Sequence, residues 1–155
     1  MIVISDTSPI NYLVILGYVD FLPHLFDTVI IPTEVHRELT ADRTPQVVRD
    51  WIQNRPDWLE IRSGNLLFID EYLDPGECSA IGLALEIQFA GLLIDDLSAR
   101  IAAENQGLNV TGTVGVLERA HQQGWLDLTT ALSELKATNF RISDALIKLV
   151  IDRNA

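Results

Sequence analysis

The sequence predicts one α/β domain over residues 1–155, built as a three-layer α/β/α sandwich around a mainly parallel central sheet. Three observations predict this fold. The chain has 155 residues, the usual length of one domain. Short apolar stretches alternate along it with longer stretches of helical pattern. Several of the short stretches are apolar throughout, which is typical of strands covered on both faces.

The first half of the chain is divided by clear breaks between its apolar stretches. Gly17 separates two helical patterns, and Pro32 stops an apolar run. We expect, in order, a strand at 2–4, helices at 9–17 and 18–26, a strand at 28–31, helices at 33–40 and 45–54, and a strand at 59–61.

The second half contains the clearest helix start of the chain, Asp74-Pro-Gly-Glu77. Asp74 can cap, proline suits the first helical position, and Glu77 completes a capping box. This helix is expected to reach about Phe89. We then expect a strand at 92–94, a helix at 97–105, a strand at 108–110, and helices at 112–123, 129–137 and 143–153.

The charge of the chain restricts its function. The formal net charge is −11, with two lysines and nine arginines. Such a chain repels a phosphate backbone, so a passive nucleic-acid-binding role is not expected. A nuclease remains possible, because bound divalent cations reverse the local potential at an active site.

The chain shows no targeting or membrane signal. No apolar run approaches the length of a bilayer span, and no basic region precedes the first apolar stretch. Cys78 is the one cysteine, so neither an internal disulfide nor a structural zinc site is expected. We therefore expect a cytoplasmic protein that does not interact with membranes.

Acidic residues follow two of the apolar strands. Asp6 comes directly after residues 2–4, and Asp95-Asp96 comes after residues 92–94. The carboxyl ends of parallel strands meet at one edge of a sheet, where ligands bind. Asp6 could equally cap the following helix. The adjacent acids favour a site more strongly, since such pairs usually share a proton or bind a cation.

Two glutamates on predicted helices are further candidates. Glu77 begins a core-facing stripe, where it could face a pocket or simply complete the capping box. Glu38 lies beside Val35 and Leu39, which should face the core. Glu34, one turn earlier, competes with Glu38 for the same role, and we prefer Glu38.

Together these motifs resemble the PIN-domain nucleases, specifically the small VapC-like toxins and their close relatives. The matching segments occur in the family's order over about residues 2–120. They are Val3-Ile-Ser-Asp-Thr-Ser8, Ile30-Ile-Pro-Thr-Glu-Val-His-Arg-Glu-Leu39, Gly76-Glu-Cys-Ser-Ala-Ile-Gly-Leu-Ala84, Leu92-Leu-Ile-Asp-Asp-Leu-Ser-Ala-Arg100 and Val110-Thr-Gly-Thr-Val-Gly115.

The resemblance implies a Mg²⁺- or Mn²⁺-dependent ribonuclease that hydrolyses phosphodiester bonds. It carries over Asp6, Glu38, Glu77 and Asp95 as the catalytic acids, with Asp6, Glu77, Asp95 and Asp96 as metal ligands. Thr7, Arg100, Thr111 and Thr113 match accessory positions that contact phosphate or water. Many relatives have a further acid or Asn where this chain has Thr-Gly-Thr. The implied partners are an RNA substrate, a small antitoxin protein and a second copy of the chain in a homodimer.

Three other functions fit the sequence less well. A haloacid-dehalogenase-type phosphatase needs a second Asp two residues after Asp6, where this chain has Ser8. A phospho-acceptor domain needs a lysine after a late strand, but the lysines come at 136 and 148. A PIN fold retained for protein binding alone would not need the full set of acids. The scattered histidines and the tryptophans indicate no site of their own.

Overall fold

A computed structural model of the chain describes residues 1–65 and 68–155. In these residues the strands form one five-stranded sheet in the order β3-β2-β1-β4-β5, and every neighbouring pair is parallel. The elements are β1 (Ile2–Ser5), α1 (Thr7–Leu16), η1 (Val19–Phe21), α2 (Leu22–Leu25), β2 (Thr28–Pro32), α3 (Thr33–Leu39), α4 (Gln46–Gln53), β3 (Leu59–Arg62), α5 (Pro75–Glu86), β4 (Gly91–Leu93), α6 (Leu97–Asn105), β5 (Val110–Thr111), α7 (Thr113–Gln122), α8 (Leu128–Lys136) and α9 (Asp144–Arg153).

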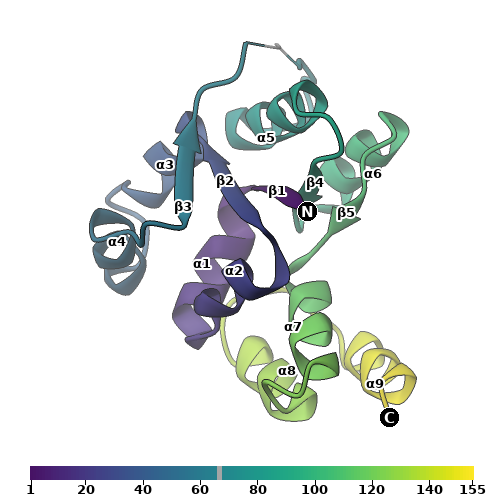
Figure 1. Cartoon of the computed structure of the whole chain (residues 1–155). Helices are drawn as coiled ribbons and strands as arrows, with labels where there is room; N and C mark the ends of the chain where they lie inside the picture. Colours follow the sequence, from purple (N-terminus) through teal and green to yellow (C-terminus); the bar gives the residue numbers. More distant parts are fainter. Residues whose placement is uncertain (66–67) are drawn as a thin grey trace.

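Strand β1 lies at the centre of the sheet, between β2 and β4. Ile4 pairs with Ile30 on one side and with Leu92 on the other. All three side chains are almost completely buried. Their β-branched or leucine side chains can be uniformly apolar because helices cover both faces of the sheet (Figure 1).

The two faces of the sheet contact different helices, because successive strand residues point to opposite sides. Val3 and Leu93 belong to the larger core, which includes buried residues of α1, α4, α7 and α8. Ile4 and Leu92 belong to the smaller core, with α5 and α6. This arrangement confirms the predicted three-layer α/β/α sandwich, and the sheet in the described residues is entirely parallel.

The predicted elements are largely present, with four differences. Helix α5 ends at Glu86 and not near Phe89, where φ is 63°. Strand β5 is Val110–Thr111 and not 108–110. Helix α1 begins at Thr7, directly after Asp6, and not at residue 9. The single helix expected at 18–26 is wrong, because that segment divides into the short 3₁₀ helix η1 and the one-turn helix α2. Pro23 falls at the start of α2, where a missing amide hydrogen costs no hydrogen bond.

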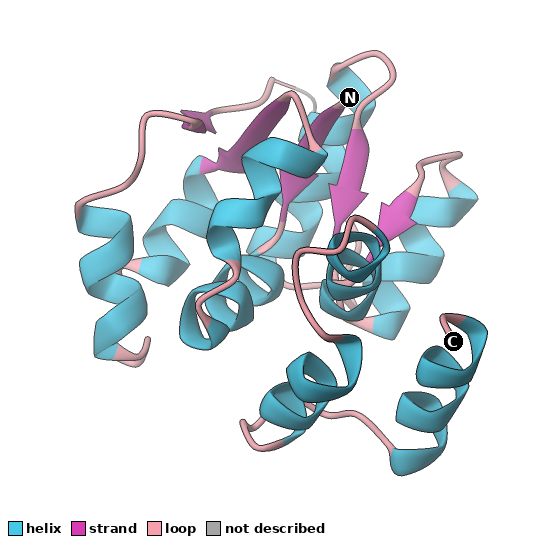
Figure 2. Ribbon diagram, turned by 60° about the horizontal axis from the view of Figure 1, so that its bottom comes forward, coloured by secondary structure: helices cyan, strands magenta, loops and turns pink. Residues whose placement is uncertain are grey.

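The last three helices extend the fold beyond the sheet. Helices α7 and α8 pack on the larger core through residues such as Leu117 and Leu132. The C-terminal helix α9 packs against α8 and contributes Val150 to the same core. It lies at the edge of the molecule (Figure 2). Among the described residues, no helix combines the length and apolarity needed to cross a membrane.

Candidate active site

Asp6 lies where the central strand ends. Its backbone amide donates to the Leu93 carbonyl at 2.9 Å, which ties the end of β1 to β4. Its side chain is only 5% exposed and makes no capping hydrogen bond to α1. Within the described residues, the carboxylate oxygen Oδ1 of Asp6 is buried without any hydrogen-bond partner. Its side chain is therefore available for a role other than capping.

The charge of Asp6 is unfavourable in this position. Burial raises the pKa of its carboxyl well above the usual range, against a smaller opposing effect of the Thr7 backbone amide. The neighbouring carboxylates of Asp74, Glu77 and Glu38 raise the pKa further. A proton or a cation would relieve this repulsion.

Glu38 reaches the same site from α3. The Thr7 hydroxyl donates a hydrogen bond to its Oε2. Its carboxylate also lies so close to Gly76 that a Cβ there would come within 2.5 Å of Oε1 and would displace the carboxylate. Burial raises the pKa of Glu38, and the Thr7 hydrogen bond partly offsets this. Glu34, the competing residue, lies against a different cavity with Ser63 and Cys78.

Glu77 forms the complete capping box that the sequence indicated. Its backbone amide donates to Asp74 Oδ1 at 2.7 Å, and its Oε1 accepts from the Asp74 amide at 3.0 Å. Its side chain is nevertheless part of the acidic cavity, and burial raises its pKa. Glu77 thus both caps the helix and lines the cavity, the two alternatives that the sequence left open. Within the described residues, its carboxylate accepts its hydrogen bond through Oε1.

The adjacent acids Asp95 and Asp96 have different surroundings. Asp95 Oδ2 accepts from the hydroxyls of Ser8 at 2.6 Å and Thr113 at 2.7 Å, while Oδ1 accepts from the Thr113 amide at 2.7 Å. These neutral donors fix the Asp95 side chain without neutralising it. Asp96 is exposed, and its Oδ2 accepts from the Ala99 amide at 3.0 Å as the N-cap of α6.

The four accessory residues lie in two different places. The hydroxyls of Thr7 and Thr113 are already donated to Glu38 and Asp95, so these residues orient carboxylates. Thr111 and Arg100 line an adjoining cavity together with Asp95. The backbone carbonyl of Thr111 accepts from the Ile94 amide at 3.0 Å, which holds β5 against the end of β4.

The acidic cavity has a volume of about 720 Å³ and brings together all of the predicted acids. It also contains residues that the sequence did not indicate. Asp74 was assigned only as a helix cap, and nothing local marked the segment after α8. These additional lining residues are Asn11, Tyr12, Asp74, Asn139, Phe140 and Arg141.

The C-terminal segment reaches the cavity by contacts with Tyr12. The Tyr12 hydroxyl donates to Asn139 Oδ1 at 2.7 Å, and its ring meets Phe140 edge-on with centroids 4.9 Å apart. Burial raises the pKa of Tyr12, and the charge of Asp95 raises it further. No pattern within residues 137–142 could have predicted this placement, because it depends on how α8 packs on the core.

The family model of the PIN domain matches residues 2–154 of this chain. The chain belongs to the PIN-domain family. This confirms the resemblance to the family that the ordered motifs indicated. Among curated proteins, no sequence matches the chain. PIN domains have a nuclease-type fold and are generally nucleases, which agrees with the cluster of carboxylates at the sheet edge.

PIN-domain nucleases generally use divalent metals. Carboxylate oxygens are the ligands that Mg²⁺ and Mn²⁺ prefer, and Asp6 Oδ1 is a buried oxygen without a donor. In the described residues, however, no three Asp, Glu, His or Cys side chains are already arranged to hold an ion. The donor chemistry of this PIN domain nevertheless fits a hard cation, because Mg²⁺ needs only one or two protein carboxylates when waters complete its coordination shell.

The site also bears on the other functions considered. Ser8, where a phosphatase of the haloacid-dehalogenase type needs its second acid, donates its hydroxyl to Asp95. Of the two lysines, Lys136 pairs with Asp144 between α8 and α9, and Lys148 lies exposed on α9. The PIN domain thus has the surroundings of neither a phosphatase nor a phospho-acceptor site.

Proposed function

We propose that this PIN domain is a Mg²⁺- or Mn²⁺-dependent ribonuclease and the toxin of a toxin–antitoxin pair. The observation that carries the nuclease proposal is the buried Oδ1 of Asp6, which has no donor within the described residues and faces further carboxylates. A carboxylate kept in such a place without a donor needs a cation or a proton. Family membership supplies the reaction class.

The residues would act in distinct ways. Asp6, Glu77 and Asp95, with Glu38, would hold the cation, and Asp96 would attract it from the exposed rim. A bound divalent cation supplies Lewis-acid stabilisation of the phosphate and a lowered pKa for a bound water. Burial raises the pKa of Glu38 and Glu77 in the metal-free protein, so a bound cation would stabilise their charged forms. Ser8 and Thr113 keep Asp95 in a fixed position.

Cleavage of RNA by the purified chain tests this proposal. We expect Mg²⁺ or Mn²⁺ to support hydrolysis and EDTA to abolish it. Asp6→Asn keeps the size of the side chain but removes its charge, so turnover should fall roughly a hundredfold or more. Asp57 is an exposed acid in the loop before β3, and Asp57→Asn is the matched control, which should cleave at the wild-type rate.

Either of two results would overturn the nuclease proposal. One is cleavage that continues unchanged in EDTA, and the other is an Asp6→Asn variant as active as the control. A chain that binds other proteins but cleaves no RNA under any metal condition would instead favour a PIN fold retained for protein binding.

The partner of the proposed toxin should be basic, because the cavity lined by Asp6, Glu38, Asp74 and Glu77 is strongly acidic. An Arg or Lys of an antitoxin could occupy the place of the metal. Leu97 is exposed at the acidic cavity, and Tyr72 and Ile101 are exposed at a separate cavity that α6 also lines, so these side chains offer contact area for such a partner or for a second copy in a homodimer. Co-expression with a neighbouring small reading frame should give a complex that inhibits cleavage.

A further inference from the structure

A second cavity adjoins the acidic one and differs from it in charge. It has a volume of about 600 Å³ and lies between β5, α7 and α9. Four arginines line it, although the whole chain has nine arginines and a net charge of −11. Asp95, Phe140 and Arg141 line both cavities, so the acidic site and this arginine cleft are continuous. The arginines of the cleft are Arg100, Arg119, Arg141 and Arg153.

Among the residues that the structure describes, Arg153 is the one arginine of the cleft that forms an ion pair with a carboxylate. Arg153 donates to both oxygens of Glu118, from Nε at 2.8 Å and from Nη2 at 2.5 Å. The guanidinium of Arg119 lies over the Phe26 ring at 4.7 Å, a contact that positions the charge but leaves it uncompensated. Among the described residues, no carboxylate forms an ion pair with Arg100, Arg119 or Arg141.

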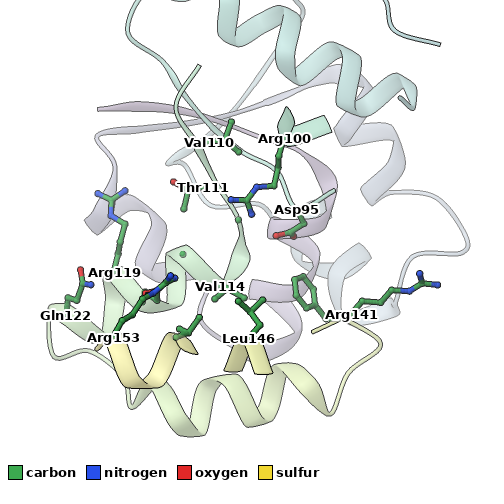
Figure 3. A pocket seen from close by; sticks show the side chains of 15 residues that line it. Asp95, Arg100, Val110, Thr111, Val114, Arg119, Gln122, Arg141, Leu146 and Arg153 are labelled. Atoms are coloured by element: carbon green, nitrogen blue, oxygen red, sulfur yellow. The ribbon is translucent and has the colours of Figure 1, made fainter. Parts of the chain in front are cut away.

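The positions of these side chains are visible in Figure 3. Arg100 extends from α6 toward the middle of the cleft beside Asp95, and Arg119 lies across from it. Arg141 is at the rim and points outward, on the side that meets the acidic cavity. Val114 and Leu146 form an apolar floor.

Across the described residues only Arg62 and Arg153 pair with a carboxylate, so what sets the cleft arginines apart is that they line one cavity. Like charges that share one cleft repel each other, which costs stability unless an anion binds there. A guanidinium binds phosphate oxygens through two parallel hydrogen bonds, and its flat face tolerates a neighbouring base.

We propose that Arg100, Arg119 and Arg141 bind phosphates of a single-stranded RNA next to the bond that is cleaved. The inference rests on the proposed function, because it places the scissile phosphate at the carboxylates and the flanking strand in the arginine cleft. It also gives the C-terminal segment a role, since Arg141 follows α8 and α9 closes the cleft. The cleft thus offsets locally the repulsion that the acidic chain exerts on RNA.

Binding measured apart from cleavage tests this path. The probe is a short fluorescein-labelled single-stranded oligoribonucleotide, followed by anisotropy with the full chain carrying Asp6→Asn in Mg²⁺. Each of Arg100→Gln, Arg119→Gln and Arg141→Gln should weaken binding about threefold, and the triple variant about thirtyfold. Each lost contact should also reduce the slope of log Kd against log salt by about 0.7. Arg100→Lys should keep that slope.

The matched control is Arg62→Gln, which makes the same change in charge. Arg62 lies on β3, at the opposite edge of the sheet from β5, and pairs with Glu60. The control should bind as tightly as the parent protein. If the cleft variants bind like this control, or if the parent binds polyglutamate but not the oligoribonucleotide, the inference is wrong. The two proposals can also fail separately. If the wild type cleaves RNA without metal while the arginine substitutions still weaken binding, the proposed catalysis is wrong and the proposed RNA-binding cleft is supported.

Discussion

Asp6 combines burial, an oxygen without a donor and several like-charged neighbours. Together these raise its pKa, and the pKa values of Glu38 and Glu77 are raised for the same leading reason, burial. In the unfolded chain these carboxyls lose their protons near pH 4, at about the ordinary values. In the folded protein, the same three carboxyls keep their protons to higher pH because their pKa values are raised. The stability that these groups contribute is therefore complete below about pH 4 and is lost as pH rises through the folded pKa values.

The direction of this pH dependence predicts how Asp6→Asn will affect stability. The metal-free variant should be more stable than the wild type at neutral pH, and the difference in melting temperature should shrink as pH falls toward about 4. Melting curves in EDTA across this range measure it. Glu118 and Asp127 have lowered pKa values and the opposite pH dependence, but they contribute equally to both proteins. A difference that does not vary with pH would show that Asp6 carries no unfavourable charge in the folded state.

The two roles of Glu77 can be separated by one substitution. Gln also offers an oxygen to the Asp74 amide, so Glu77→Gln should change stability by less than about 1 kcal/mol. It lacks the negative charge of a metal ligand or base, so turnover should fall roughly a hundredfold. Asp127→Ala, which removes the cap of α8, should lower the melting temperature without affecting turnover. Cleavage by Glu77→Gln at the wild-type rate would leave Glu77 as a helix cap alone.

At the level of elements, the junction from β5 to α7 positions Asp95. A Cβ at Gly112 would lie 2.9 Å from Asp95 Oδ1 and 2.8 Å from Arg100 Nη1. Gly112→Ala should therefore displace one or both side chains. We expect turnover to fall by about tenfold or more, since small misplacements of catalytic groups are costly. The fold should remain, because φ is −96° at Gly112 and alanine adopts that backbone readily. Unchanged steady-state kinetics would contradict the tight packing at this junction.

The sequence predicted the elements well where apolar runs and breaking residues coincide. The strand ending at Asp6 and the helix starting at Asp74 are examples, because each has a strong local signal. The start of α1 was missed because Thr7 and Ser8 show no apolar periodicity. The expected helix at 18–26 failed because tertiary packing can stabilise short 3₁₀ and α turns that local propensity does not distinguish.

The positions of Asp6, Asp95 and Asp96 could be predicted because the end of a buried strand is marked in the sequence, whereas Glu38 and Glu77 were indicated by their places on core-facing helices and by the family resemblance. The residues that contact these acids could not be predicted. Ser8 and Asp95 are 87 positions apart, and their hydrogen bond follows only from the order of the strands. Asp74 was already explained by capping, so nothing suggested a second role. Arg141 reaches the site through the packing of α8, which no short segment encodes.

For the whole molecule, the net charge of −11 makes cations a source of stability. Mg²⁺ or Mn²⁺ should raise the melting temperature, because it binds the assembled carboxylates only in the folded state. At about ten times its Kd the ion adds roughly 1.4 kcal/mol. Calorimetry with KCl at equal ionic strength separates this from general screening. Asp6→Asn and Asp95→Asn should each remove most of the rise, and a wild-type rise in both variants would place the ion elsewhere.

The central position of β1 has a consequence for how the chain folds. β1 is made of the first residues of the chain, yet its β4 neighbour follows only after α5. Closing such a long loop is slow, so sheets of this topology fold later than local helices and hairpins. The segment at Asn139–Arg141 joins the cavity from still further along. No partly folded intermediate in which β4 is unpaired can therefore contain the assembled carboxylates, and on a growing chain the cluster cannot form before β4 and Asp95 have been made.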